Sequence, residues 1–151
     1  MSYIQDIRAL VGPRPLIIVT AGVLILDERG RLLLQRRADD GLWGVPGGCM
    51  EIGETLEETA RREVREETGL EVRELALFDV VSDGEIYTYP NGDQANIVSV
   101  IYRAIRIEGD LAADRDESLE LRFFSLDKLP NLPLSGQNRS ILRRFLQTQE
   151  K

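Results

Sequence analysis

The sequence predicts an α/β fold in which helices cover both faces of a mixed β-sheet. An apolar run at residues 16–27 predicts a long buried strand. Residues 55–68 carry apolar side chains at helical spacing, and residues 85–107 have the pattern of two strands joined by a tight turn. Because helices and strands are interspersed along the chain, we expect them to pack in layers around the sheet.

The length and composition fit one domain. With 151 residues, 42% of them hydrophobic, the chain can bury one core, so we expect a single domain over residues 1–151 with an N-terminal helix over residues 1–12. The sequence lacks a run of about eighteen apolar residues and the apolar core of a signal peptide. We therefore expect a cytoplasmic protein without a membrane partner.

The first third of the chain predicts a helix, two strands and a loop. Residues 3–11 place apolar side chains on one side of a helix, and two prolines follow them. A short turn joins the strand at 16–27 to a second strand at 31–37. The segment 38–48 is rich in glycine and holds the only tryptophan, so we expect a loop.

The central helix has clear start and stop signals. Thr55 is a candidate N-cap, and Glu58 three residues later completes a capping box. Gly69 is suited to end the helix, which should run to about Thr68.

The rest of the chain predicts strands, a loop and a closing helix. These are a strand at 70–82, two strands within 85–107 joined at Pro90–Asp93, an acidic loop at 108–120, a strand at 121–126 and a helix at 137–148.

Three glutamates of the central helix stand at i, i+3 and i+4, so they lie on one side: Glu63, Glu66 and Glu67. An apolar stripe of the same helix must face the core. Glu67 projects between Leu56 and Ala60 of this stripe, and Glu63 lies beside Leu56 on the other flank. Glu66 lies just outside that pair. A carboxylate on the inward side costs several kcal/mol unless it is paired or bound to metal. The spacing therefore favours a divalent cation.

A solvated helix with ion pairs is the alternative interpretation. It suits Glu57 and Glu58, which have Arg61 and Arg62 four residues later. It does not suit Glu67, because no arginine of the helix reaches this side chain in the favourable orientation.

The chain contains no histidine and a single cysteine, Cys49. This excludes nucleophile pairs with histidine, HExxH zinc sites and an internal disulfide. A metal would be held mainly by oxygen, which favours Mg²⁺ or Mn²⁺ over zinc. The net charge of −7 and the pI near 4.7 disfavour general nucleic-acid binding, but they are compatible with a small anionic ligand bridged by metal.

Gly48, Glu54 and the run Arg62–Leu70 have the residue types and spacing of a complete Nudix box. The chain therefore resembles the Nudix hydrolase family, and the segments WGVPGG before the box and RFFSLDKLP near the C-terminus are similar to it too. The resemblance implies a Nudix-type α/β/α sandwich with a mixed β-sheet, in which a strand–loop–helix box binds divalent metal. It also implies hydrolysis within the pyrophosphate of a nucleoside diphosphate that is linked to another group.

The resemblance further implies roles for individual residues. By position, three glutamates would be catalytic metal ligands: Glu63, Glu66 and Glu67. The carbonyl of Gly47 would be an additional metal ligand. Glu54 and Arg62 would form a structural ion pair that ties the loop to the helix.

A general base is also needed, and the family draws it from the box or from a later loop. Glu117 is the first candidate, because it precedes an aromatic strand in an acid-rich loop. Glu120 is the second candidate and Asp116 the third. Glu63 could act as the base instead, and a merely solvated acidic loop is the alternative interpretation.

Other residues are candidates for substrate contact. Gly48 and its neighbouring glycines let the backbone approach a ligand closely. Arg36 or Arg37 at the end of the second strand could meet a phosphate. Trp43 could stack on a base, although a lone tryptophan in a glycine-rich loop more often packs in the core.

The favoured function is a Mg²⁺-dependent pyrophosphohydrolase, with Mn²⁺ as the alternative cofactor. The expected substrate is a small nucleotide, either a nucleotide sugar such as ADP-ribose or a nucleoside triphosphate. A regulatory module that senses nucleotides with the Nudix fold is one alternative. RNA 5′-end pyrophosphohydrolysis is another, which the acidic pI disfavours. A homodimer is compatible with the sequence.

Overall fold

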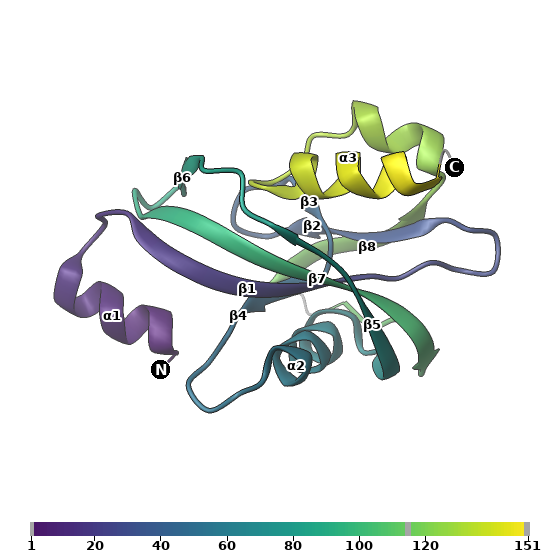
Figure 1. The fold of residues 1–151 in the computed structure, drawn as a ribbon, viewed down its shortest axis with the longest axis horizontal. Helices are drawn as coiled ribbons and strands as arrows, with labels where there is room; N and C mark the ends of the chain where they lie inside the picture. The colour runs from purple at the N-terminus through teal and green to yellow at the C-terminus, as the bar shows by residue number, and fades with distance from the viewer. Residues whose placement is uncertain (1, 114–115, 150–151) are drawn as a thin grey trace.

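A computed structural model describes residues 2–113 and 116–149 of the chain. Its helices are α1 (Tyr3–Val11), α2 (Leu56–Thr68), the 3₁₀ helix η1 (Leu126–Asn131) and α3 (Asn138–Gln149). Its strands are β1 (Leu16–Leu24), β2 (Leu32–Arg37), β3 (Trp43–Gly44), β4 (Gly47–Cys49), β5 (Glu71–Val81), β6 (Ile86–Thr88), β7 (Gln94–Glu108) and β8 (Ser118–Phe124). The strands form two sheets, with α2 on one side and α3 on the other (Figure 1).

The larger sheet is mixed. Its strand order is β4-β1-β7-β5, and β6 pairs with the start of β7. β1 and β7 run parallel from Leu16↔Ala95 to Leu24↔Arg103, whereas β4, β5 and β6 pair antiparallel with their neighbours. The smaller sheet, β3-β2-β8, is antiparallel. The mixed sheet with helices on both faces is therefore confirmed, and the smaller sheet is a feature that the sequence did not predict.

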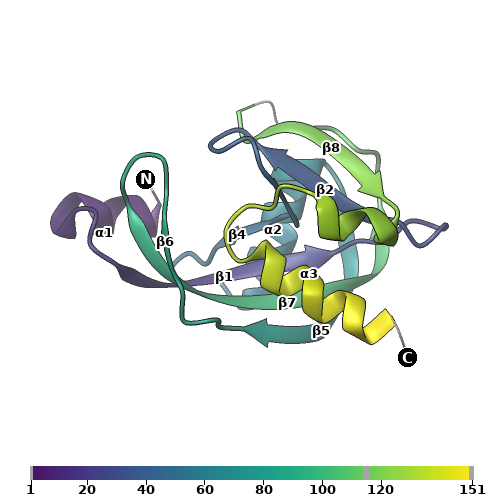
Figure 2. The ribbon, with the colours of Figure 1, turned by 90° about the horizontal axis from the view of Figure 1, so that it is seen from above.

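Helices α2 and α3 lie on opposite sides of the strands (Figure 2). Alternating side chains of β1 and β2 supply a separate core on each side of the sheets. Toward α2, Val23 and Leu33 pack with Ala60 and Val64. Toward α3, a second cluster contains Leu24, Leu32, Leu34, Trp43, Ile101, Phe124, Ile141 and Phe145. Because both helices bury apolar stripes on the sheets, the position of each helix side chain relative to the strands is well defined.

Helix α1 lies beside the end of the larger sheet (Figure 1). Ser2 and Gln5 form a capping box at its start. The guanidinium of Arg8 donates to the carbonyl of Gly12 at 3.1 Å and to that of Gln94 at the start of β7. Arg8 thereby connects α1 to the hairpin formed by β6 and β7.

The prediction of a loop over residues 38–48 is wrong in one respect, because the segment contains the short strands β3 and β4. Gly47 and Gly48 of β4 pair with Gly22 and Ala21 of β1. A Cβ atom on Gly47 would lie 2.4 Å from the carbonyl oxygen of Ala21, so only glycine allows this approach. A run of glycines in a sequence suggests a loop, but here the lack of side chains on these glycines lets β4 pair closely with β1. The 3₁₀ helix η1 was also not predicted.

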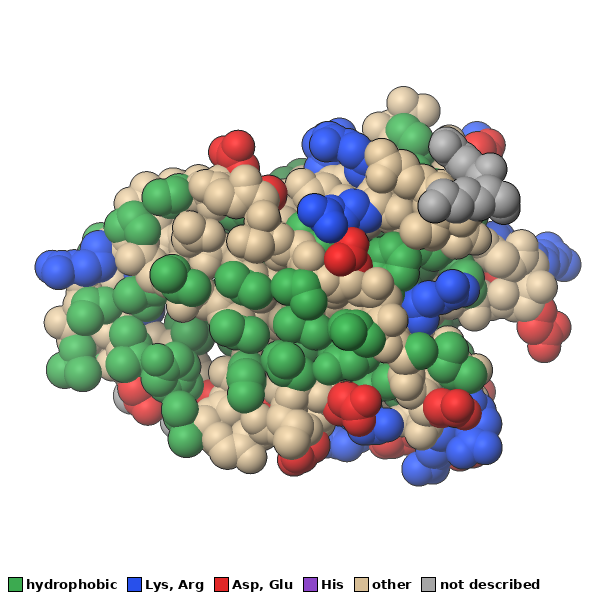
Figure 3. Space-filling model, viewed as in Figure 1, with side chains coloured by type: hydrophobic (Ala, Val, Ile, Leu, Met, Phe, Trp, Pro, Cys, Tyr) green, Lys and Arg blue, Asp and Glu red, His purple; other side chains and the backbone are tan. Residues whose placement is uncertain are grey.

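The described surface is apolar in places. Figure 3 shows hydrophobic side chains gathered over β1, β7 and α1, and the exposed apolar residues of these elements include Leu10, Ile17 and Val19. Within residues 2–113 and 116–149, no helix combines the length and apolar character needed to cross a bilayer.

Candidate active site

The position of the glutamates on α2 follows from where the helix starts and stops. The Thr55 side chain accepts a hydrogen bond from the backbone of Glu58, whose side chain reaches back to Thr55, and Gly69 adopts a left-handed conformation at the other end. With the helix set in this way, Glu67 turns inward and is only 3% exposed. The side chain of Glu66 points outward and is 45% exposed.

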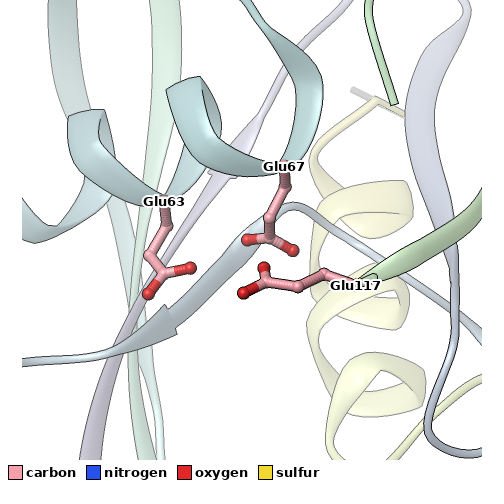
Figure 4. Close-up of side chains that lie close together, drawn as sticks. All are labelled: Glu63, Glu67 and Glu117. Carbon is pink, nitrogen blue, oxygen red and sulfur yellow. The ribbon is translucent and has the colours of Figure 1, made fainter. Parts of the chain in front are cut away.

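Three carboxylates meet in front of α2 (Figure 4). Glu63, Glu67 and Glu117 each offer an oxygen, and these oxygens lie within 4.8 Å of one another. Glu117 directly precedes β8, and its carbonyl accepts a hydrogen bond from the backbone of Ala38 at 3.0 Å. The pairing of β8 with β2 thus brings a residue fifty positions along the chain to the side chains of the box.

Glu67 is the most enclosed of the three. It accepts hydrogen bonds from the backbone N–H of Gly47 at 2.9 Å and from the amide of Gln35. The Gln35 carbonyl oxygen in turn accepts from the Ser118 hydroxyl at 2.5 Å. Burial, and next the negative charge of Glu63, raise the pKa of Glu67 well above its ordinary value, although these hydrogen bonds oppose the shift. The carboxylate is placed where its own charge is unfavourable.

Arg62 connects the start of the box to the helix. Its guanidinium lies 2.6 Å from Glu54 and 2.8 Å from Glu63, and it also donates to the carbonyl of Cys49 at 3.1 Å. The hydrogen bond from Arg62 is the main cause that lowers the pKa of Glu54 to about 2. The expected ion pair between Glu54 and Arg62 is therefore present. Glu66 also pairs with Arg62, at 3.4 Å, and lies outside the group of three carboxylates.

Gly48 leaves room for the carboxylate of Glu63. A Cβ atom at this position would lie 2.5 Å from the carboxyl carbon of Glu63. Such a distance is far below ordinary contact, so any other residue would displace the Glu63 carboxylate. The requirement for glycine here is set by the site itself.

The three carboxylates open into a pocket of about 400 Å³. One end is lined by Glu63, Glu67, Glu117, Gly47, Gly48, Gln35, Arg37 and Asp116. The other end lies among β1, β7 and the start of α3, and its lining includes Thr20, Ser99, Gln137, Val45, Ile97, Ile101 and Ile141. The pocket therefore joins a highly charged region to a half-apolar one.

The two strand-end arginines differ in position. Arg37 lines the pocket, and Asp39 accepts two hydrogen bonds from its guanidinium at 3.0 and 2.9 Å. Burial would lower the pKa of Arg37, but Asp39 and the charge of Glu67 raise it above its ordinary value, so Arg37 stays a cation. Arg36 lies 3.8 Å from Glu120 and is not among the pocket-lining residues of the described chain.

Trp43 lies in the core on the α3 side. Its ring is 7% exposed and meets Phe124 edge-on at 4.9 Å, and the guanidinium of Arg122 lies 5.6 Å from its centre. Among described residues, it does not line the pocket. Stacking of Trp43 on a base stays a prediction without support from this packing.

The candidate bases occupy different surroundings. Glu117 lies in the carboxylate group and Asp116 lines the pocket. The carboxylate of Glu120 accepts a hydrogen bond from Arg122 at 2.9 Å.

Four polar residues of the pocket were not predicted from the sequence: Gln35, Thr20, Ser99 and Gln137. Only one of these had a usable signal: a glutamine inside the apolar strand LLLQ is a buried polar residue in need of a partner.

The donor set fits a hard divalent cation. All three gathered ligands are carboxylates, and oxygen ligands are those that Mg²⁺ and Mn²⁺ prefer. Burial, and next the charge of Glu63, raise the pKa of Glu67, and a bound cation would favour its ionised form against both effects. The fold and the site thus define an α/β/α protein with an acidic, glycine-lined ligand pocket.

Comparisons with known proteins agree with this class. A family model described as NUDIX domain matches residues 17–145. The chain is 35% identical over 112 residues to the ADP-ribose pyrophosphatase of Methanocaldococcus jannaschii, covering 72% of this chain and 62% of that protein. It is 31% identical over 124 residues to the nucleoside triphosphatase NudI of an Enterobacter species, covering 76% and 87%.

A solved structure agrees as well. The crystal structure of a MutT Nudix hydrolase from Burkholderia pseudomallei has 30% sequence identity and a TM-score of 0.71, covering 85% of this chain and 98% of that one. The chain belongs to the Nudix hydrolase family, which confirms the resemblance inferred from the box. It spans 62% of the length of the archaeal relative, and helix α1 precedes the family match.

Proposed function

We propose that the chain is a divalent-metal-dependent hydrolase that cleaves the pyrophosphate linkage of a nucleoside diphosphate derivative. The observation that carries this proposal is the meeting of Glu63, Glu67 and Glu117 at the charged end of a pocket that Arg37 also lines. A group of three carboxylates with an arginine in the same pocket lining suits a ligand whose phosphates are bound partly through a cation and partly directly.

Glu63 and Glu67 would hold Mg²⁺ or, alternatively, Mn²⁺, with Glu66 and the Gly47 carbonyl as further ligands. A bound cation of this kind neutralises phosphate oxygens and lowers the pKa of its water. Glu66 would have to turn away from Arg62 to take part, because the two lie 3.4 Å apart. Gln35 and the Gly47 N–H would keep the Glu67 carboxylate oriented through their hydrogen bonds.

Glu117 would be the general base that takes a proton from the attacking water. One of its carboxylate oxygens lies within 4.8 Å of oxygens of the other two carboxylates, and its backbone carbonyl accepts from Ala38, the residue directly after β2. Arg37 would contact a phosphate of the substrate, since its guanidinium is a permanent cation on the pocket wall. Gly48 would act on the substrate indirectly, because the space beside its Cα is taken by the Glu63 carboxylate.

The substrate would be a small nucleotide with a phosphoanhydride bond. The archaeal relative is named for ADP-ribose and the Enterobacter relative for nucleoside triphosphates, and both compounds contain this bond. The acidic pI disfavours long RNA as a substrate. A cytoplasmic location fits such metabolites.

The test is a substrate screen with a matched pair of variants. Purified protein with Mg²⁺, and separately with Mn²⁺, is incubated with ADP-ribose, other nucleotide sugars, nucleoside triphosphates and 5′-triphosphorylated RNA, and products are separated by chromatography. Glu67→Gln should lose about 100-fold or more of the rate, as expected when a cation is held less well. Glu57→Gln is the control, since this exposed glutamate of the same helix lies outside the carboxylate group and pairs with Arg61 at 3.6 Å.

Release of a nucleoside monophosphate by the wild type and by Glu57→Gln, but not by Glu67→Gln, supports the proposal. Binding of nucleotide without turnover of any compound would instead support a sensing module.

A further inference from the structure

The half-apolar end of the pocket contains a chain of three hydrogen-bonding side chains. Thr20 of β1 and Ser99 of β7 are cross-strand neighbours, and their hydroxyl oxygens lie 3.0 Å apart. The Ser99 hydroxyl lies 2.5 Å from the side-chain carbonyl oxygen of Gln137, just before α3. Ser99 and Gln137 are 4% and 3% exposed, whereas Thr20 is half-buried at the pocket wall.

The direction of these hydrogen bonds is determined at Gln137. Its amide nitrogen donates to the backbone carbonyl of Ile97 at 3.0 Å, and a carbonyl can only accept. The amide group therefore cannot be flipped, and its carbonyl oxygen faces Ser99. Ser99 must donate its single proton to Gln137.

The consequence passes on to Thr20. Because the Ser99 proton is already used, the contact between the two hydroxyls requires Thr20 to donate to Ser99. No second hydrogen bond of the Thr20 hydroxyl is found within residues 2–113 and 116–149. Its oxygen keeps only acceptor capacity on the side of the pocket. A hydroxyl, which could normally rotate to donate or accept, is restricted to accepting.

We propose that Thr20 is a specificity-determining residue whose oxygen accepts a hydrogen bond from a donor group on the nucleoside part of the substrate. This inference rests on the proposed function, which places the diphosphate at the carboxylate end of the same pocket. The lining of the same pocket includes the apolar side chains of Val45 and Ile97, which suit the face of a planar base. The donor would be an amino group of the base or a hydroxyl of the sugar.

Because the direction of the Thr20 hydroxyl is fixed, it distinguishes donor-bearing from acceptor-bearing ligands more strongly than a freely rotating hydroxyl would. A ligand with an acceptor in place of the donor would set two lone pairs against each other, because Thr20 cannot turn its proton toward the ligand without breaking its bond to Ser99. The three side chains also connect β1, β7 and α3. If that were their only role, a substitution of Thr20 would change the affinity for every ligand by the same factor.

The test measures binding and does not depend on turnover. Calorimetry with Mg²⁺ compares AMP with purine riboside 5′-monophosphate, which lacks the amino group, and GMP with IMP. Two further analogues, 2′-deoxy-AMP and 3′-deoxy-AMP, remove the sugar hydroxyls in turn. The proteins are wild type, Thr20→Val, which removes the oxygen at equal size, and Thr20→Ser, which keeps it.

The wild type should bind one donor-bearing ligand about threefold to tenfold more tightly than its donor-free analogue, the range of one net hydrogen bond. Thr20→Val should abolish this preference and Thr20→Ser should retain it. Ser99→Ala releases the Thr20 proton, so this variant should keep affinity but lose the discrimination against acceptor-bearing ligands, with its melting temperature recorded to follow the fold.

A wild type without such a preference, or a preference that survives in Thr20→Val, overturns the proposal. The analogue that loses affinity tells whether the base or the sugar supplies the donor. Because binding is measured directly, a failure here is separate from an absence of hydrolysis in the substrate screen.

Discussion

The glutamates of the box are alike in sequence but different in surroundings. Glu67 is almost fully buried, Glu63 forms an ion pair with Arg62, and Glu66 is exposed on the side of α2. The helical wheel predicts this order of burial, since Glu67 projects into the apolar stripe, Glu63 lies beside it and Glu66 stands outside. The convergence of Glu117 on the same point could only be a hypothesis, because a contact across fifty residues depends on how β8 pairs with β2.

Glu66→Gln should therefore be milder than Glu67→Gln. We expect Glu66→Gln to lower Mg²⁺ affinity by about tenfold or less, against about 100-fold for the buried residue, because an exposed ligand is easily replaced by water. Calorimetric titration of Mg²⁺ into each variant measures the difference. Equal losses in the two variants would show that Glu66 turns inward when metal binds.

Gly48→Ala should separate activity from folding. Its added Cβ would lie 2.5 Å from the Glu63 carboxyl carbon, which is the end of a flexible side chain and can move. Gly48 does not have a positive φ, so the backbone tolerates alanine. We expect kcat to fall by about 100-fold from a displacement of roughly 1 Å. The melting temperature should change little, and a large drop in it would mean that the strand β4 has come apart.

At the level of elements, the sequence is most informative where residues close together in the chain determine where a helix or strand begins and ends. The capping box, the left-handed Gly69 and the hairpin turn all use short-range signals, and helix α2 and strands β6 and β7 were predicted from them. Strands β3 and β4 were missed, because their pairing depends on glycines that accept a neighbouring strand. The smaller sheet was missed for the same reason, since no local pattern separates one sheet from two.

The tie between Glu54 and Arg62 should show a definite pH dependence. The pKa of Glu54 is lowered to about 2, so the stabilisation is complete above the ordinary pKa of 4.5 and is lost as the pH falls from there toward about 2. We expect Glu54→Gln to cost about 1 kcal/mol at pH 7, a value reduced by partial solvent exposure, or roughly 2–4 °C in melting temperature.

Thermal unfolding of both proteins between pH 7 and pH 3 measures this effect. The two melting curves should converge on acidification, and a gap that is independent of pH would assign the effect to packing rather than to charge.

At the scale of the whole molecule, the pocket is assembled from segments that no local pattern connects. β1, the box, the chain before β8 and the start of α3 each supply lining residues. The family resemblance predicted their common fold, whereas the hydrogen-bonded partners across them required the structure. The single domain over residues 1–151 and the homodimer stay predictions, which a one-step unfolding transition and sedimentation analysis would check.

Arg8→Ala should loosen the N-terminal helix and, through it, the pocket rim. The Arg8 side chain is 11% exposed and holds carbonyls of residues 12, 14 and 94, so its removal leaves them without this donor. We expect a loss of about 1–3 kcal/mol in unfolding free energy. KM should rise while kcat changes little, because the β6–β7 hairpin leads to Tyr89 on the pocket and the carboxylates lie elsewhere.

The exposed side chain of Arg14 provides a matched control, and Arg14→Ala should behave as the wild type in steady-state kinetics and thermal unfolding. A kcat that falls together with the KM change would mean that α1 also supports the carboxylates.

The burial of Glu67 beside Glu63 has a consequence for the lifetime of the chain. Without a cation, the folded form carries a repulsion between Glu63 and Glu67 that Arg62 offsets only in part and that the unfolded form does not have. A cation that binds only the folded form removes this repulsion. Under the proposed function, proteolysis in an extract treated with a chelator would therefore be faster than in one supplied with magnesium. Ion supply would then govern how much of this polypeptide persists as well as how fast it works.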